Sequence, residues 1–194
     1  MRFLMQNKKI YLYGDNIGSV EYVQHMGDDL TIVNAARVSF GKQKEELDGR
    51  DRKLIRYLIN HRHTSTLEHN LVTFRFVVPL FVRSQHHRHR TWSYNEISRR
   101  YTDENLRFYE PVSFRTQHKS NRQASNIDQI NPIIYPDWDD PDSGYKADQV
   151  VMMHHKSSVE LYNSLMRQGV CREQARGVLP QSLYTEYYGT VNLN

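Results

Sequence analysis

The stretch RSQHHRHRTWSYNEISRRY, residues 83–101, concentrates positive charge in a short span of the chain. It contains five arginines and three histidines but a single acid, Glu96, and no lysine. A guanidinium group presents a planar fork of donors that matches phosphate oxygens, whereas a lysine ammonium is a point charge. We therefore predict that this stretch binds a phosphorylated anion.

Two kinds of site are consistent with such a stretch. A nucleic-acid or other polyanion surface needs charge and tolerates loose spacing, and a basic composition with interleaved aromatic residues favours this interpretation. A nucleotide site instead assigns each group to one oxygen or ring atom. Composition alone leaves both open, so the choice depends on the individual residues.

Length and composition indicate a globular protein of one domain. The 194 residues are enough for a core, and 38% hydrophobic with 25% charged residues is typical of a polar-surfaced globular fold. The net charge of +4 is modest and locally concentrated, which favours a small anionic ligand over a general polyanion coat. No apolar run is long enough to cross a bilayer, and the N-terminus is too polar after Met5 for a secretory signal. A single cysteine, Cys171, excludes an internal disulfide framework, and we expect a cytoplasmic protein without a membrane partner.

Periodicity and turn residues predict an α/β or α+β domain. Strands are expected at 9–13, 19–24 and 71–79, and helices from Asp28 or Asp29 through 36 and at about 48–60, 81–88, 145–168 and 171–178. Residues 91–101 are predicted to form an extended loop and 102–143 a surface excursion, while 183–194 resembles the approach to a further helix, with Asn192 as its cap.

Histidines at 61, 63 and 69 raise the question of a metal site. Their spacing, HRHxxxxxH, fits no common metal motif, and stacking in a polar loop explains them equally well. The aspartates at 137, 139, 140 and 142 lack the glycine and glutamate of a calcium loop. We therefore predict no metal site.

The individual residues of the basic stretch favour a nucleotide site over a polyanion surface. They follow the pattern R-H-R-x-x-S-x-N-x-x-S-x-R, which resembles the signature of the flavin-dependent thymidylate synthases. Three further segments resemble that family: AARVSF (35–40), HTSTLEH (63–69) and GVCREQARGVLPQSLYTEYYGTVN (169–192). The signature positions are Arg88, His89, Arg90, Ser93, Asn95, Ser98 and Arg100.

Several positions depart from the family pattern. Ser84 stands where an arginine is common, although Gln85 is in register. Ser65 and Thr66 stand in place of the usual threonine and proline, so a hydroxyl is kept at the first position. Cys171 occupies a position where proline is frequent, and we interpret it as a small structural residue.

The resemblance implies an enzyme that makes dTMP from dUMP, with methylenetetrahydrofolate as carbon donor and NADPH-reduced FAD as hydride source. It also implies a mixed α/β fold with a small mixed sheet and a homotetramer with active sites between subunits. Hydride delivery from flavin needs no thiolate, which agrees with the lack of any nucleophile motif around Cys171.

The resemblance also assigns roles to individual residues. Arg88, Glu96 and Ser98 are placed in the catalytic group, with Ser98 as a phosphate ligand because no local base arrangement marks it as a nucleophile. The FAD ligands would be Ser39, Ser65, Glu68, Arg88, His89, Arg90, Asn95, Glu96 and Asn192. The dUMP ligands would be Gln85, Arg88, Glu96, Ser98, Arg99, Arg100 and Arg176.

In the family, the segment after Asn192 leads into a helical part with further FAD contacts and an arginine that polarises the uracil ring. We therefore expect residues 1–194 to be the synthase domain without its C-terminal helical segment. The alternative is a truncated family member that binds nucleotide or nucleic acid without turnover. Because the signature favours a nucleotide site, nucleic acid is the less favoured partner.

Overall fold

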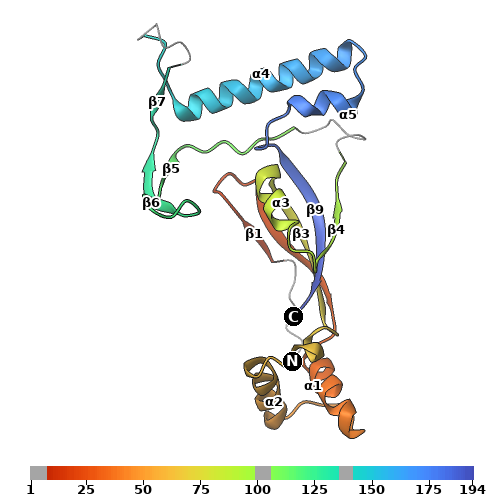
Figure 1. Cartoon of the computed structure of the whole chain (residues 1–194). Helices are drawn as coiled ribbons and strands as arrows, with labels where there is room; N and C mark the ends of the chain where they lie inside the picture. The colour runs from red at the N-terminus through yellow and green to blue at the C-terminus, as the bar shows by residue number, and fades with distance from the viewer. Residues whose placement is uncertain (1–7, 99–105, 136–141) are drawn as a thin grey trace. The chain divides into compact units, whose positions relative to one another are not determined.

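The computed structural model describes residues 8–98, 106–135 and 142–194 (Figure 1). The chain divides into two compact units. The first contains Met1–Ile97 and Thr185–Asn194, and the second contains Ser98–Tyr184. In the part of the chain that is described, no helix is both long and apolar enough to cross a membrane.

The first unit is built on a five-stranded sheet with the order β1-β2-β3-β9-β4 (Figure 1). Its antiparallel β1–β2 pair is joined by a turn in which the Asp15 carboxylate accepts hydrogen bonds from the backbone N–H groups of Ile17 (2.9 Å) and Gly18 (3.1 Å). The two strands expected at 9–13 and 19–24 are thus observed, the first two residues shorter and the second two residues longer. The strands are β1 (Lys9–Tyr11), β2 (Ser19–Met26), β3 (Leu71–Pro79), β9 (Tyr184–Asn192) and β4 (Ser93–Glu96).

Two strands of this sheet correct the sequence predictions. The stretch 183–194, expected to lead towards a further helix, forms the nine-residue strand β9 over 184–192. The stretch 91–101 is not only a loop, because β4 pairs antiparallel with β9, placing Asn95 opposite Tyr188. The paired residues of the two strands lie more than 90 positions apart in the chain, so the local sequence gives little sign of the pairing.

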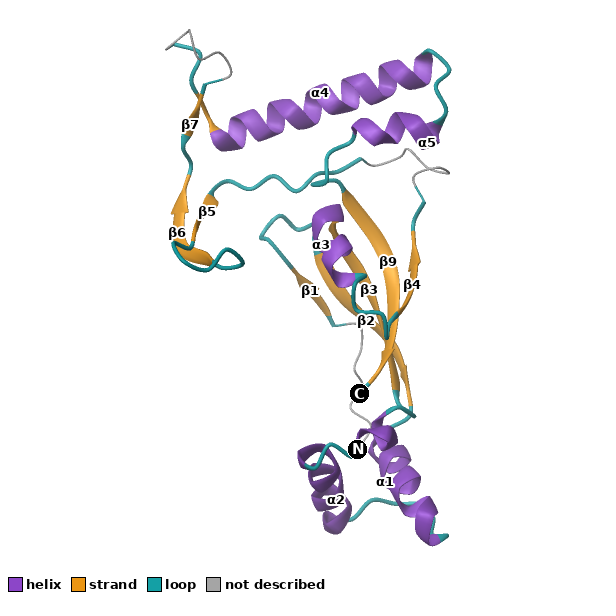
Figure 2. Cartoon of the chain, in the orientation of Figure 1, coloured by secondary structure: helices purple, strands orange, loops and turns teal. Residues whose placement is uncertain are grey.

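Two helices and two 3₁₀ turns form a small cluster beyond the ends of β2 and β3 (Figure 2). Asp28 caps the first helix and Asp48 the second, each in a reciprocal capping box, which confirms both predicted starts. The elements are α1 (Asp29–Arg37), η1 (Val38–Phe40), α2 (Gly49–Asn60) and η2 (Thr64–Leu67). Their apolar core consists of Ile32, Leu58 and Leu67, with Ala36, Leu54 and Ile55 packed against it.

A buried carboxylate links these two helices. The Asp51 side chain is fully buried and pairs with Arg37 Nη2 at 2.6 Å and Lys44 Nζ at 2.5 Å. It also accepts the backbone N–H of Asp48 at 2.9 Å. Both carboxylate oxygens therefore have donors, as a buried charge requires.

The helix α3 (Leu80–His86) follows β3 directly and begins after Pro79, whose φ of −63° suits a helix start. The expected helix at 81–88 is thus confirmed, with its end two residues earlier. Its last residue, His86, packs against aromatic rings of the sheet, including Phe76 at 4.8 Å and Trp92 at 4.7 Å between ring centroids. This contact fixes the chain where α3 leads into β4.

Gly189 on β9 is the position where this aromatic packing is tightest. A Cβ atom there would lie 3.0 Å from Trp92 and 3.1 Å from Phe76. We expect Gly189→Ala to lower the free energy of unfolding by about 1–3 kcal/mol, because a side chain would overpack the two rings. Denaturant unfolding measures this effect.

The matched control for that variant is Gly49→Ala. Gly49 is the first residue of α2 and a Cβ there meets nothing within 4 Å, so this change should be neutral or stabilising. A Gly189→Ala protein as stable as the wild type would show that Trp92 moves aside without cost.

The second unit contains the longest helix, α4, and two short hairpins (Figure 2). The predicted helix at 145–168 is confirmed, except that its first two residues form strand β8. The predicted helix at 171–178 is divided into an α-helical and a 3₁₀ part, and the expected surface excursion contains a β-hairpin. The elements are β5 (Phe114–Gln117), β6 (Ser125–Ile130), β7 (Ile133–Ile134), β8 (Tyr145–Lys146), α4 (Ala147–Arg167), α5 (Arg172–Ala175) and η3 (Arg176–Val178).

His155 ties α4 to the rest of the second unit. Its ring is buried and stacks on Phe108 at 4.7 Å. One ring nitrogen is hydrogen-bonded to Glu110 at 3.2 Å and the other to Ser182 at 2.7 Å. Both polar atoms of this buried histidine are therefore satisfied, and the residue joins three segments that are distant in sequence.

Candidate functional site

The centre of the signature lies in the turn between α3 and β4. Arg88, His89 and Arg90 are exposed there, and backbone hydrogen bonds from Arg88 to Gln85 (3.2 Å) and from His89 to His86 (3.0 Å) shape the turn. The guanidinium groups of Arg88 and Arg90 make no hydrogen bond or ion pair with any described residue. Their donors are therefore available to an anionic ligand.

Aromatic side chains of β4 and β9 stabilise this turn by hydrogen bonds and ring stacking. The Tyr187 hydroxyl is hydrogen-bonded to His86 Nδ1 at 2.8 Å, and the Tyr94 hydroxyl donates to the carbonyl of His86 at 2.8 Å. His87 stacks on Tyr94 with ring centroids 4.0 Å apart. Burial raises the pKa of Tyr187 far above its usual value, and it lowers the pKa of His86 and of His87. Near pH 7 these groups are neutral, so the exposed arginines carry the positive charge of the turn.

Glu96 lies at the end of β4 with its carboxylate tightly held. Its Oε1 atom accepts from Arg83 Nε at 3.0 Å and from Thr185 Oγ1 at 2.6 Å. Arg83, which belongs to the basic stretch but to none of the predicted ligand sets, has its charge paired with Glu96. Sequence reasoning did not single out Thr185, since it lies 89 residues from Glu96.

Strand register brings one group of expected FAD ligands towards the same end of the sheet. Ser93, the first residue of β4, lies opposite Thr190 on β9. Asn192 follows two residues later, and Asn194 donates its side-chain amide to Glu68 Oε1 at 2.8 Å. Arg90, Asn192 and Glu68 thus belong to neighbouring segments of the first unit, although they are far apart in sequence.

Other expected ligands in the first unit are accessible but lie on different elements. Ser39 is exposed in η1, and Ser65 is exposed in η2, against which α1 packs. Gln85 is exposed on α3, and Asn95 is exposed on β4. All four side chains are therefore exposed, and none is buried in the core.

The remaining expected substrate ligands fall within the residue range of the second unit. Ser98 belongs to it, and Arg176 is exposed at the start of η3, where its Nε donates to the carbonyl of Glu173 at 3.4 Å. Arg99 and Arg100 lie outside the described residues. Among the residues that are described, no group of three histidine, cysteine or acidic side chains is arranged to hold a metal ion.

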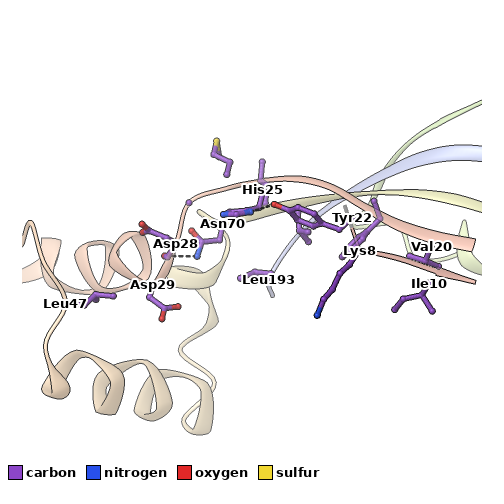
Figure 3. Close-up of a pocket in the computed structure, with 15 residues that line it drawn as sticks. Lys8, Ile10, Val20, Tyr22, His25, Asp28, Asp29, Leu47, Asn70 and Leu193 are labelled. Carbon is purple, nitrogen blue, oxygen red and sulfur yellow. Dashed lines mark hydrogen bonds between the residues drawn. The ribbon is translucent and has the colours of Figure 1, made fainter. Parts of the chain in front are cut away.

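The first unit also contains a groove that sequence reasoning missed. Its volume is about 760 Å³, and it lies on the β1–β2–β3 part of the sheet and continues towards α1 (Figure 3). Apolar side chains such as Ile10, Val20 and Phe74 line it, with a few polar groups near Asp28. None of the expected site residues lines this groove, so it is separate from the turn that carries the signature.

Comparison with known proteins identifies the family. Residues 21–194 match the family model described as thymidylate synthase complementing protein. The chain belongs to this family. The family predicted from the signature is therefore confirmed, and so is the predicted mixed α/β fold.

Relatives of this thymidylate synthase family member are similar over most of its length. The flavin-dependent thymidylate synthase of Kosmotoga olearia is 41% identical over 175 residues, which are 90% of this chain and 71% of that protein. The flavin-dependent thymidylate synthase of Thermus thermophilus is 41% identical over 177 residues, which are 91% of this chain and 60% of that protein. The chain thus spans between three fifths and three quarters of these relatives.

Solved structures of similar proteins support the same family assignment. A UMP/dUMP methylase from Streptomyces cacaoi bound with 5-Br UMP matches with a TM-score of 0.70 and 34% identity, covering 90% of this chain and 71% of that one. The complex of the methylase with 5-Br dUMP matches with a TM-score of 0.72, covering 94% of this chain and 76% of that one.

Proposed function

We propose that this chain carries out flavin-dependent thymidylate synthesis, in which dUMP is methylated to dTMP. Methylenetetrahydrofolate supplies the carbon and NADPH the reducing equivalents. The observation that carries the proposal is the α3–β4 turn, where Arg88 and Arg90 have no ion-pair partner among the described residues and lie close in sequence to a fixed Glu96. The names of the similar proteins provide independent support.

The residues of the first unit suit FAD, which carries two phosphates and several hydrogen-bonding groups. Arg88, His89 and Arg90 would hold its phosphates, since two guanidinium groups in one turn, without a side-chain partner among the described residues, match paired anions. Further hydrogen bonds would come from the hydroxyl groups of Ser39 and Ser65, the carboxylates of Glu68 and Glu96, and the amides of Asn95 and Asn192. Bound FAD supplies hydride transfer, and the protein supplies the charge and orientation that this chemistry requires.

The substrate is proposed to be dUMP, held chiefly by its phosphate. The solved relatives bound with brominated UMP and dUMP support a uridylate. Proposed ligands are Gln85, Arg88, Glu96, Ser98, Arg99, Arg100 and Arg176. Cys171 is exposed immediately before α5, and the proposed chemistry assigns it no role as nucleophile.

The working form is proposed to be a cytoplasmic homotetramer with active sites shared between subunits. The support within this chain is the apolar groove, whose rim includes exposed Ile10, Met26 and Leu193. Monomeric proteins rarely leave a continuous apolar surface of this kind uncovered. Light scattering of the purified chain measures its mass directly.

A flavin absorbance spectrum, followed by calorimetry with dUMP, tests the proposed function. The purified chain, incubated with FAD and then freed of unbound FAD by gel filtration, is expected to stay yellow and to bind dUMP. The competing nucleic-acid function predicts instead a protein that is colourless after the same treatment and whose binding to a random oligonucleotide falls steeply with salt. That second pattern would remove the synthase assignment.

A further inference from the structure

The described protein donors to the Glu96 carboxylate contact one of its two oxygens. Both protein donors, Arg83 Nε and Thr185 Oγ1, meet the same oxygen, Oε1. No described residue donates to Oε2, and the side chain remains 22% exposed. Among the described residues, Oε1 therefore has two protein donors and Oε2 has none.

The two donors come from elements that are themselves rigid. Arg83 lies on α3, and Thr185 is a buried residue near the start of β9 with 4% of its surface exposed. The backbone supports the same arrangement, because the N–H of Ile97 donates to the carbonyl of Glu186 at 2.9 Å. A glutamate side chain has three rotatable bonds, so two donors on one oxygen greatly restrict where the other oxygen points.

We propose that Arg83 and Thr185 are positioning residues that hold Glu96 Oε1 so that Oε2 accepts a hydrogen bond from a donor group of the bound pyrimidine nucleotide. This inference rests on the proposed function, since it deepens the role of Glu96 within the same site. The buried hydroxyl of Thr185 on β9, which lies outside the signature, thus sets the orientation of Glu96, the only acid of the signature.

The first test measures dUMP affinity of FAD-loaded protein by calorimetry. Thr185→Val keeps the shape and removes the hydroxyl, and it should weaken dUMP binding about tenfold, as expected for one lost hydrogen bond to a charged group. Thr185→Ser restores a hydroxyl and should recover most of the affinity. The shift of the flavin absorbance bands on adding dUMP gives a second readout without turnover.

Thr190→Val is the matched control on the same strand. Its hydroxyl is paired with Thr73 at 2.9 Å and does not touch Glu96. This variant should keep the wild-type dUMP affinity. If Thr185→Val does not fold, Arg83→Met provides the same test from the other donor, because methionine is long but cannot donate.

A double-mutant cycle with Glu96→Ala separates positioning from general stability. Once Glu96 is absent, Thr185→Val should cause no further loss of dUMP affinity. An equal loss in both backgrounds, or wild-type affinity in Thr185→Val, would overturn the inference while leaving the proposed function intact. A wild-type protein that binds neither FAD nor dUMP would instead remove both.

Discussion

Protein carrying both Arg88→Gln and Arg90→Gln is expected to purify without flavin and to remain colourless after incubation with FAD and removal of the unbound FAD by gel filtration. Glutamine keeps polarity and most of the length but loses the charge of each guanidinium. Hydrogen bonds to charged groups contribute about 1.5–3 kcal/mol each, so losing both should weaken FAD binding by roughly 10²–10⁴-fold. Titration of the apoprotein with FAD, followed by fluorescence quenching, measures the change.

A control with the same change in net charge is available in the β5–β6 hairpin. Arg115 and Arg122 are both exposed there. Replacing both by glutamine removes two positive charges and should leave FAD affinity close to the wild-type value. If the two double variants lost FAD equally, long-range charge and not the α3–β4 turn would govern binding, and the assignment of Arg88 and Arg90 would fail.

Asp51→Asn is expected to cause the largest loss of stability in the first unit. The asparagine keeps the shape of the side chain but removes the negative charge that compensates Arg37 and Lys44. Removing one partner from a buried ion-pair network is strongly destabilising, and we expect the midpoint of thermal unfolding to fall by roughly 5–10 °C. Glu46→Gln, an exposed acid in the same segment, should leave the midpoint unchanged.

The same network predicts an acid dependence of stability. The hydrogen bonds from Lys44, from the backbone N–H of Asp48 and from Arg37 hold the pKa of Asp51 well below its ordinary value of 3.8. Because the folded-state pKa is the lower one, the stabilisation is complete well above pH 3.8 and is lost as pH falls from there towards the folded-state value.

The pH dependence can be measured with the same variant. Thermal unfolding of the wild type should therefore become steadily easier on acidification in this range, while Asp51→Asn should lose less. Parallel curves for the two proteins would show that other carboxylates determine the acid limit.

Local chemistry in the sequence was sufficient to predict the helix starts and the signature turn. Asp28 and Asp48 cap the next helix through their own side chains, and Pro79 begins α3, so each start depends on residues within one turn. The alternation of apolar and polar residues likewise marks β3 as a strand, which is half buried at first and fully buried over its last three residues, 77–79. The nucleotide site was predicted from the resemblance of residues 88–100 to the family signature, because composition alone left a polyanion surface also open.

Only the tertiary structure decided which residues meet across the sheet. The strands β4 and β9 were missed because their pairing joins residues that are distant in the chain, such as Ser93 and Thr190, which local periodicity does not encode. The hydrogen bond from Thr185 to Glu96 spans 89 residues and could not be foreseen for the same reason, and the Arg83–Glu96 pair depends on how α3 and β4 fold against each other. Composition counted Arg83 among the five arginines of the basic stretch, but folding brings its Nε within 3.0 Å of the Glu96 carboxylate, and this ion pair neutralises its charge within the protein.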